Sequence, residues 1–343
     1  MTLVKGLVEL VVASGKGGVG KSTLTASLAV LLARRGVRMS VVDADAEAPN
    51  LYILLGVGDD EWSSVEVYRE GRVAYIRDDI CTRCGVCADV CPYGAVERLE
   101  DGRYYINPWI CEGCITCSAA CPDKAIRYRF NVEAGVIKVA AKTRYGFPFV
   151  MGEIRPGRPN SGKLVTELKN RGKALLGGEG LLLVDAAAGI GCQVISSLTG
   201  AQLAILVAEP TPASLSDLKR VHKLAKHFGI ASMLVINKYD LNPDYVSVIE
   251  EYARSENMPV LGRIPYDETV AKAAAAGRPL VEYDPDSPAA KAIAMIEEKL
   301  ATEVLPNWRE WWSRYRPSKP EPYVPVIIGP GGRTGASGLP RLA

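Results

Sequence analysis

The sequence predicts an α/β protein, with a doubly wound and mostly parallel sheet that is interrupted by a small α+β insert. Six apolar segments alternate with helical stretches, which is the pattern of parallel strands joined by helices. These segments lie near residues 7–13, 39–43, 181–185, 203–207, 231–236 and 260–264. A glycine-rich turn follows the first segment, and two cysteine runs follow the second. A chain of 343 residues is long enough to bury a sizeable core around such a sheet.

Composition gives no sign of a nucleic-acid or membrane partner. The net charge is +2, from 41 basic and 39 acidic residues, so the chain carries no strong overall field. The opening stretch "MTLVKGLVELVVASGKGG" becomes glycine-rich before an apolar segment reaches the length of a signal peptide or a membrane span. We therefore expect a soluble cytoplasmic protein.

The first apolar segment runs directly into "GKGGVGKS" and then into the helical stretch "TLTASLAVLLARRG". In a strand–loop–helix of this kind, backbone N–H groups surround phosphates at the positive end of the helix. Lys21 would reach the outer phosphates and Ser22 would coordinate Mg²⁺, whereas a simple glycine-rich turn is the alternative. We expect ATP and Mg²⁺ as ligands. The expected contact residues are Gly15, Gly17, Gly18, Val19, Gly20, Lys21, Ser22 and Thr23.

Eight of the nine cysteines fall into two copies of C-x2-C-x2-C-x3-C-P, "CTRCGVCADVCP" and "CEGCITCSAACP". This spacing is that of metal thiolates rather than of disulfides. Structural zinc is one alternative, because two C-x2-C pairs can bind it tetrahedrally. However, a third cysteine two residues later and a proline after the fourth are typical of ferredoxins with two clusters.

In that ferredoxin pattern the fourth cysteine of each run ligates the cluster of the other run. The sequence thus predicts two 4Fe-4S sites. The first is Cys81, Cys84, Cys87 and Cys121, and the second is Cys111, Cys114, Cys117 and Cys91. We expect an insert at residues 73–128, a host domain at 1–72 and 129–303, and a tail at 304–343 that is aromatic and then rich in proline and glycine.

With Lys16, the loop "KGGVGKS" resembles the deviant Walker A loop of the MinD/ParA/Mrp class, which includes the nitrogenase iron protein. Four later segments agree with this resemblance: "VVDADAEAPNL", "LLLVDAAAGIGC", "VINKYD" and "RIPYD". The similarity covers most of residues 5–300. It is greatest to MinD-like P-loop ATPases that carry an inserted two-cluster ferredoxin domain.

The resemblance implies a role for several residues. Asp45 would help to position the attacking water, and Asp185 would support the metal from behind its ligands. Lys16 would contact the phosphates of an opposing subunit, although a solvated loop lysine is the alternative. Asn237 and Pro265 would line the nucleotide base. The class often carries Asp-x-Pro-Pro-Gly where this chain has "DAAAG" at residues 185–189, a segment called switch II, so the hydrolysis rate is open.

The ninth cysteine, Cys192, stands seven residues after Asp185. The nitrogenase iron protein has a cysteine at the same spacing, and that cysteine ligates a cluster shared across the dimer axis. Two interpretations stay open at this point. Cys192 is either a small buried residue that packs the switch helix, or a redox relay or ligand of a transient bridging cluster near a dimer axis.

For the remaining residues we predict only where they lie in the fold. His222 and His227 should lie on a solvated helix face, and Lys163 in "SGKLV" lacks the glycines of a second phosphate loop. The tail aromatics should pack back on the host domain, with an interfacial membrane helix or a partner-binding segment as alternatives. These aromatics are Trp308, Trp311, Trp312 and Tyr315.

Three hypotheses explain why clusters and a nucleotide loop share one chain. The first is that nucleotide-driven closure of a homodimer, or of a heterodimer with a homologous subunit, gates electron transfer to a redox enzyme. The second is an iron-sulfur carrier or assembly ATPase of the Mrp type that serves an apo client. The third is a MinD-like spatial organiser whose ferredoxin insert senses redox state.

Overall fold

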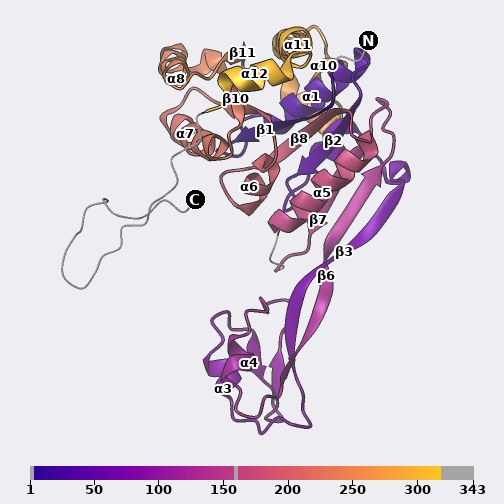
Figure 1. Ribbon diagram of the computed structural model, residues 1–343, viewed down its shortest axis with the longest axis vertical. Coiled ribbons are helices and arrows are strands. Elements are labelled where there is room, and N and C mark those ends of the chain that lie inside the picture. The colour runs from indigo at the N-terminus through magenta and orange to yellow at the C-terminus, as the bar shows by residue number, and fades with distance from the viewer. Residues whose placement is uncertain (1–3, 158–160, 318–343) are drawn as a thin grey trace, which may run out of the picture.

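A central nine-stranded sheet organises the protein, whose computed structural model describes residues 4–157 and 161–317 (Figure 1). The strand order is β11-β10-β9-β1-β8-β2-β7-β6-β3, and the strands from β11 to β7 run parallel. All six predicted strands are confirmed: β1 (Leu7–Ser14), β2 (Met39–Ala44), β8 (Gly180–Ala188), β9 (Leu203–Ala208), β10 (Ala231–Asn237) and β11 (Val260–Ile264). A further parallel strand, β7 (Phe149–Ile154), was not predicted from the sequence.

Helices cover both faces of this sheet, and each face has its own apolar core. Along β1, Leu10 and Val12 belong to one core, whereas Val11 and Ala13 belong to the other. Burial on both faces explains why the strands read as continuous apolar runs. The helices are α1 (Lys21–Arg34), α2 (Leu51–Leu55), α5 (Ser161–Leu176), α6 (Cys192–Leu198), α7 (Pro212–His227), α8 (Pro243–Ser255), α9 (Thr269–Ala275), α10 (Leu280–Tyr283), α11 (Pro288–Lys299) and α12 (Trp308–Tyr315), with shorter turns at Asp59–Glu61, Tyr239–Leu241 and Leu300–Val304.

Two long antiparallel strands, β3 (Ser64–Ile76) and β6 (Ile126–Ala140), join the host sheet to the cysteine-rich segment. The expected insert boundaries at residues 73 and 128 fall inside these two strands. Each strand therefore belongs partly to the host sheet and partly to the insert. At the far end lie α3 (Val86–Asp89), β4 (Val96–Arg98), β5 (Tyr104–Ile106) and α4 (Thr116–Ala120). We call the part of β3 and β6 beyond the host sheet the stem, which comprises residues 68–76 and 126–135.

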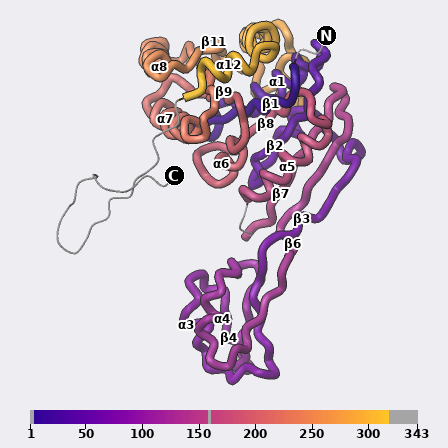
Figure 2. Tube along the Cα trace, in the orientation of Figure 1, coloured from indigo at the N-terminus to yellow at the C-terminus, as the bar shows by residue number. Residues whose placement is uncertain are grey.

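The stem leaves the sheet where β7 ends. Ile154 pairs with Gly135, and a register shift follows Tyr68 on the opposite strand. A β-carbon on Gly135 would lie 2.3 Å from the Glu153 carbonyl oxygen, so this crossing requires glycine. Bulges of this kind bend and twist a strand pair. From Tyr68 to Ile76 the ladder spans on the order of 25 Å at about 3.3 Å per residue, and Figure 2 shows the insert standing off the host body.

The direction of the stem follows from the strand pairing. β6 is antiparallel to both β7 and β3, and β7 is parallel to β2, so β3 runs in the same direction as β2. β3 therefore leaves the sheet at the carboxyl edge of the parallel strands. At the same edge β1 runs into the glycine-rich loop.

The tail aromatics pack on the host domain, as predicted. The indole nitrogen of Trp308 donates to the Lys5 carbonyl at 2.9 Å, and that of Trp312 donates to the Gly229 carbonyl at 3.1 Å. The proline- and glycine-rich part of the tail, residues 318–343, lies outside the described residues. Across residues 4–157 and 161–317, we find no helix with the length and apolarity that a membrane span needs.

The prediction for His222 is wrong, because its ring is buried between α7 and α8. Its Nδ1 lies 2.8 Å from the Tyr252 hydroxyl, and burial lowers its pKa to about 4. His227 is exposed, as predicted. Lys163 is also exposed, and its ammonium lies 2.6 Å from a carboxylate oxygen of Glu70 on β3.

Candidate functional site

A cavity of about 690 Å³ opens at the carboxyl edge of the sheet, where the loops after β1, β2, β10 and β11 meet. Its volume is in the range of small-molecule and cofactor sites. Ten predicted residues line it: Lys16, Gly17, Gly18, Gly20, Lys21, Ser22, Thr23, Asp45, Asn237 and Pro265. Further lining comes from α2 and α9, whose residues the sequence analysis did not single out; these include Ile53, Leu54, Val270 and Ala271.

Two predicted contact residues, Gly15 and Val19, support the loop from behind instead. Val19 is buried, and its carbonyl accepts a hydrogen bond of 2.8 Å from the Asn237 side-chain amide. A β-carbon on Gly15 would lie 2.3 Å from the Asp217 carbonyl oxygen. Both residues thus fix the loop against neighbouring elements.

The glycine-rich loop has the conformation of an anion-binding site. Gly18 and Gly20 have φ of 78° and 88°, in the left-handed region that favours glycine. Gly20 immediately precedes α1, so the unpaired N–H groups of the first helical turn border the cavity. These donors and the helix dipole favour phosphate at this position.

A buried lysine–aspartate pair lies at the cavity floor. The Lys21 ammonium is 2.9 Å from Oδ1 of Asp185 and 3.3 Å from the Ser22 hydroxyl. The Thr25 hydroxyl also donates to Asp185 Oδ1, at 3.0 Å. The other Asp185 oxygen, Oδ2, is buried and has no hydrogen-bond partner among the described residues. Asp185 and Ser22 both contact the Lys21 ammonium, and an unpaired carboxylate oxygen and a hydroxyl suit hydrated Mg²⁺, so these residues fit a magnesium–nucleotide complex.

Asp43 is a buried acid that the sequence analysis did not single out. It pairs with Asp185 in the register of β2 and β8, and it accepts backbone N–H bonds from Asp45, Asn50 and Leu51 at 3.1, 3.1 and 2.9 Å. Burial and the Asp185 carboxylate raise the pKa of Asp43. The sequence signal for Asp43 is an acidic residue, two residues before Asp45, inside a strand that is otherwise uncharged and mostly apolar.

Asp45 itself is half-buried and lines the cavity. Its Oδ1 accepts a backbone N–H bond of 3.2 Å from Ala48, which holds the side chain at the rim. Burial raises its pKa. Asp45 thus lines the cavity, whereas Asp185 lies below its floor, where it is bonded to Lys21.

Cys192 is exposed at the start of α6, so of its two interpretations the buried packing residue is wrong. Its carbonyl rather than its thiol makes the close approach to α5, because a β-carbon on Gly162 would lie 3.0 Å from the Cys192 carbonyl oxygen. The thiol therefore lies on the surface of the helix that follows switch II.

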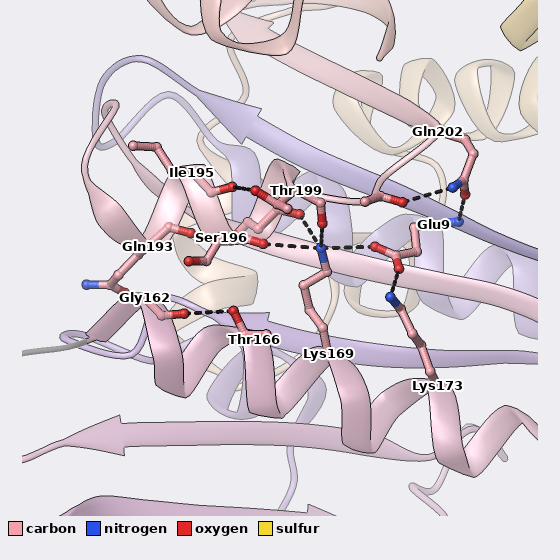
Figure 3. A network of polar contacts seen from close by, with 12 residues as sticks. Glu9, Gly162, Thr166, Lys169, Lys173, Gln193, Ile195, Ser196, Thr199 and Gln202 are labelled. Carbon is pink, nitrogen blue, oxygen red and sulfur yellow. Dashed lines mark hydrogen bonds and ion pairs between the residues drawn. The ribbon is translucent and has the colours of Figure 1, made fainter. Parts of the chain in front are cut away.

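The other end of α6 is held by Lys169, a buried residue of α5 (Figure 3). Its ammonium donates to the carbonyls of Ser196, Ser197 and Thr199 at 3.2, 2.8 and 2.6 Å. It also pairs with Oε2 of Glu9 at 3.0 Å, and burial lowers its pKa. A cation at helical carbonyls stabilises a helix end. Lys169 therefore joins α5, α6 and β1.

In the insert, a small cavity gathers Cys91, Cys111, Cys114 and Cys117, which are the predicted second set of thiols. Burial and the neighbouring Cys111 thiol raise the pKa of Cys117 to about 11. In the first run, burial and then the thiols of Cys81 and Cys84 raise the pKa of Cys87. Cys121 stands in the opposite run, where the Thr82 hydroxyl donates to Asp123 at 2.5 Å and joins the two loops.

The thiols fit a multi-iron group. Four sulfurs accept backbone N–H bonds of 3.2–3.4 Å, and N–H···S bonds tune cluster potentials; the acceptors are Cys81, Cys91, Cys111 and Cys121. In the described part of the chain, no three Cys, His, Asp or Glu side chains converge enough to hold a single metal ion. Each thiolate of a 4Fe-4S cluster binds a different iron, so cluster ligands stand further apart than ligands of one zinc ion.

Known proteins share this host architecture. A sequence model of the CobQ/CobB/MinD/ParA nucleotide binding domain, CbiA, matches residues 10–281. An uncharacterized protein of Methanocaldococcus jannaschii is 33% identical over 296 residues, covering 86% of this chain and 96% of that protein. An iron-sulfur cluster carrier protein of Pyrococcus furiosus is 26% identical and covers 86% of each chain.

Among solved structures, the septum site-determining protein MinD of Pyrococcus horikoshii OT3, complexed with Mg-ADP, aligns with a TM-score of 0.52 at 21% identity. The alignment covers 86% of this chain and 96% of that one, and it supports the same fold for the host domain. With the family match over residues 10–281, we conclude that this chain belongs to the CobQ/CobB/MinD/ParA nucleotide-binding family.

Proposed function

We propose that this protein is a P-loop ATPase that works as an iron-sulfur cluster carrier. One observation carries the proposal: the nucleotide cavity and the stem that bears eight cysteines lie at the same edge of one sheet. The Pyrococcus furiosus relative, an iron-sulfur cluster carrier protein, supports this function. Electron transfer was the first hypothesis from the sequence, whereas the relatives that are iron-sulfur cluster carrier proteins favour the second.

At the nucleotide end, phosphate oxygens would compete with Asp185 for the Lys21 ammonium. The Ser22 hydroxyl would bind Mg²⁺, and the unpaired Oδ2 of Asp185 would accept a hydrogen bond from a water on that ion. Asp45 would orient the attacking water. Lys16 is exposed at the rim, where it can reach the phosphates held by a second subunit in a closed dimer.

In the insert, each run would supply three thiolates to one site and a fourth to the other, so the two halves hold each other. A bound 4Fe-4S cluster supplies either a one-electron carrier or a transferable iron-sulfur unit. We infer that nucleotide-driven dimer closure presents the insert to an apo iron-sulfur client, because the stem extends from the same edge of the sheet that carries the nucleotide cavity.

The test begins with protein purified without oxygen, which should contain about eight irons and eight sulfides per chain. Transfer is measured as the activity recovered by an apo 4Fe-4S enzyme with Mg-ATP, with Mg-ADP and without nucleotide. We expect transfer to depend on Mg-ATP, and Lys21→Ala should retain iron while losing that dependence. Bound zinc without visible absorbance would contradict the proposal. So would recovery of client activity that is the same with Mg-ATP, with Mg-ADP and without nucleotide.

Nucleotide-gated electron delivery to a redox enzyme is the second candidate. It is favoured by the complete set of four thiols available to each site, because a fully ligated cluster is typical of stable electron carriers. EPR of the reduced protein, with and without Mg-ATP, separates the two functions. A nucleotide-dependent signal from clusters that stay on the chain throughout the transfer assay would favour electron delivery.

A further inference from the structure

The insert touches the host domain at a second place besides the stem. The loop that follows β7 reaches Gly157, whose φ is 72°. A β-carbon on Gly157 would lie 2.3 Å from the carbonyl oxygen of Trp109, so the two backbones are in direct contact and only glycine fits there. Trp109 belongs to the turn at residues 107–110, which directly precedes the second cysteine run. We call this contact between Gly157 and the turn the junction.

On the insert side, the turn is bonded to the start of the second cysteine run. The Asn107 carbonyl accepts the backbone N–H of Cys111 at 3.0 Å, and the Asn107 side-chain oxygen accepts that of Trp109 at 3.0 Å. The backbone N–H of Asn107 donates to the Ala95 carbonyl at 2.8 Å. A displacement of the turn is therefore passed directly to the backbone of Cys111.

On the host side, the junction continues into closely packed elements. β7 packs directly on α5, because a β-carbon on Gly152 would lie 2.9 Å from a side-chain carbon of Leu168. α5 packs in turn on α6, because a β-carbon on Gly162 would lie 2.8 Å from the Ser196 hydroxyl oxygen (Figure 3). Close packing of this kind transmits a displacement from one element to the next.

α6 is connected to the nucleotide cavity in two ways. It follows switch II, which begins at Asp185 below the cavity floor. The buried side chain of Gln193 on α6 also accepts the backbone N–H of Ala46 at 2.7 Å, and Ala46 directly follows Asp45 of the cavity lining. Both segments that carry the predicted catalytic acids are therefore attached to α6.

A continuous series of contacts thus leads from the nucleotide cavity through α6, α5 and β7 to the junction. The junction has no side chain that could adjust its shape, because one partner is a glycine and the other is a backbone carbonyl. A displacement of β7 relative to the insert must therefore either push the turn or separate it from Gly157. Either event changes the setting of Cys111.

We propose that the junction is a regulatory contact that is closed without ATP and opened by Mg-ATP. A ligand shifts such an equilibrium only through a difference in its contacts with the two states. The Lys21–Asp185 bond is that difference, because phosphate takes Lys21 from Asp185 and so releases the segment that leads into α6. The open junction leaves the insert attached through the stem and frees the turn before Cys111.

This assignment rests on the proposed function in one respect, namely that the cavity binds Mg-ATP. It does not depend on which group the cysteines hold. For a carrier, the consequence is that the second cysteine loop is presented to a client in the ATP-bound state and is held against the host domain in the other.

Hydrogen exchange of the full chain, with and without a non-hydrolysable Mg-ATP analogue, tests the proposal. In wild type, the analogue should speed exchange of residues 107–111 by about fivefold or more. Gly157→Ala places a carbon against the Trp109 carbonyl, so it should show the faster rate both with and without the analogue. The stem pairing should stay within about twofold of wild type in this variant.

Gly146→Ala is the matched control. Gly146 is exposed and has a φ of 93°, so alanine there carries the same backbone strain as at Gly157. Among the described residues, however, no heavy atom lies within 4 Å of the position that its β-carbon would take. This variant should keep the full response of residues 107–111 to the analogue.

A second variant leaves the junction itself intact, in case Gly157→Ala unfolds the insert. Gln193→Leu removes the bond to Ala46 and should reduce the response of residues 107–111 by about half or more, while the analogue binds within about threefold of wild type. A full response in either Gly157→Ala or Gln193→Leu would overturn the inference, as would bound analogue without any response in wild type. Failure of the analogue to bind to wild type contradicts the proposed function instead.

Discussion

The ammonium of Lys21 lies 2.9 Å from a carboxylate oxygen of Asp185, and both side chains are buried at the floor of the nucleotide cavity. In the proposed function, phosphate would replace Asp185 as the partner of Lys21, and the carboxylate could then turn toward the hydration shell of Mg²⁺. The pair thus links nucleotide binding to the segment that begins at Asp185.

Lys21→Ala should weaken Mg-ATP binding by roughly a hundredfold or more, because the charge-assisted bonds to the outer phosphates are lost. It also leaves Asp185 buried without its cation, which should cost about 3 kcal/mol of folding stability. Titration calorimetry and urea unfolding measure the two effects separately. Wild-type affinity in this variant would refute the assignment of the loop.

Lys16→Ala should behave differently, because Lys16 is exposed at the rim rather than paired at the floor. We expect Mg-ATP to bind within about threefold of wild type, whereas hydrolysis and ATP-dependent dimerisation fall by roughly tenfold or more. Steady-state phosphate release and sedimentation with Mg-ATP provide the readouts. Unchanged turnover would show that Lys16 is only a solvated loop residue.

Lys169→Met should destabilise the host domain by about 3 kcal/mol, because Glu9 loses a buried cation and three carbonyls at the end of α6 lose their donor. Lys173→Met is the matched control, since Lys173 pairs with the same Glu9 but is partly exposed. Thermal unfolding compares the two variants, and proteolysis near residues 189–200 reports on α6. Equal losses in both variants would mean that Glu9 alone accounts for the effect.

His222 predicts a pH dependence of stability. Its folded pKa of about 4 lies below the ordinary histidine pKa of 6.5, so between these pH values the unfolded chain binds more protons than the folded chain. Stability from this group is fully present above pH 6.5 and decreases as the pH falls toward 4, by about 3 kcal/mol in all. Glu256 opposes this shift and Lys226 adds to it.

Urea unfolding of wild type and His222→Gln at several pH values between 4 and 7 isolates the contribution of His222. The variant should show a shallower loss of stability on acidification. Parallel curves for the two proteins would contradict the burial argument.

The sequence predicts those parts of the fold that depend on interactions between residues close together in the chain. Strands such as β8 and β9 are buried on both faces, so their residues form continuous apolar runs. The cysteine spacing likewise predicted the thiols that line the insert cavity, because the ligands of each loop are neighbours in the chain. The glycine-rich loop and the helix after it were also predicted, since phosphate binding requires glycine at particular positions of the loop.

Features that depend on distant residues were missed. The outer part of β3 is mostly exposed or half-buried, so it lacks the apolar pattern of a core strand, and its pairing with β6 spans the whole insert. His222 looked like a surface residue because its partner, Tyr252, belongs to another helix. Burial was one of two interpretations of Cys192, because free cysteine is commonly buried, yet the start of α6 places it at the surface.

The stem also sets the orientation of the insert, because successive residues of a strand face opposite sides of the ladder. Removing one residue from each of β3 and β6 beyond Tyr68 would rotate the insert by about half a turn. Removing two from each would restore its orientation and bring it about 7 Å closer to the sheet. The length of the stem therefore sets both the distance of the insert from the sheet and its rotation about the stem axis. We expect changes in stem length to be tolerated in steps of two residues per strand.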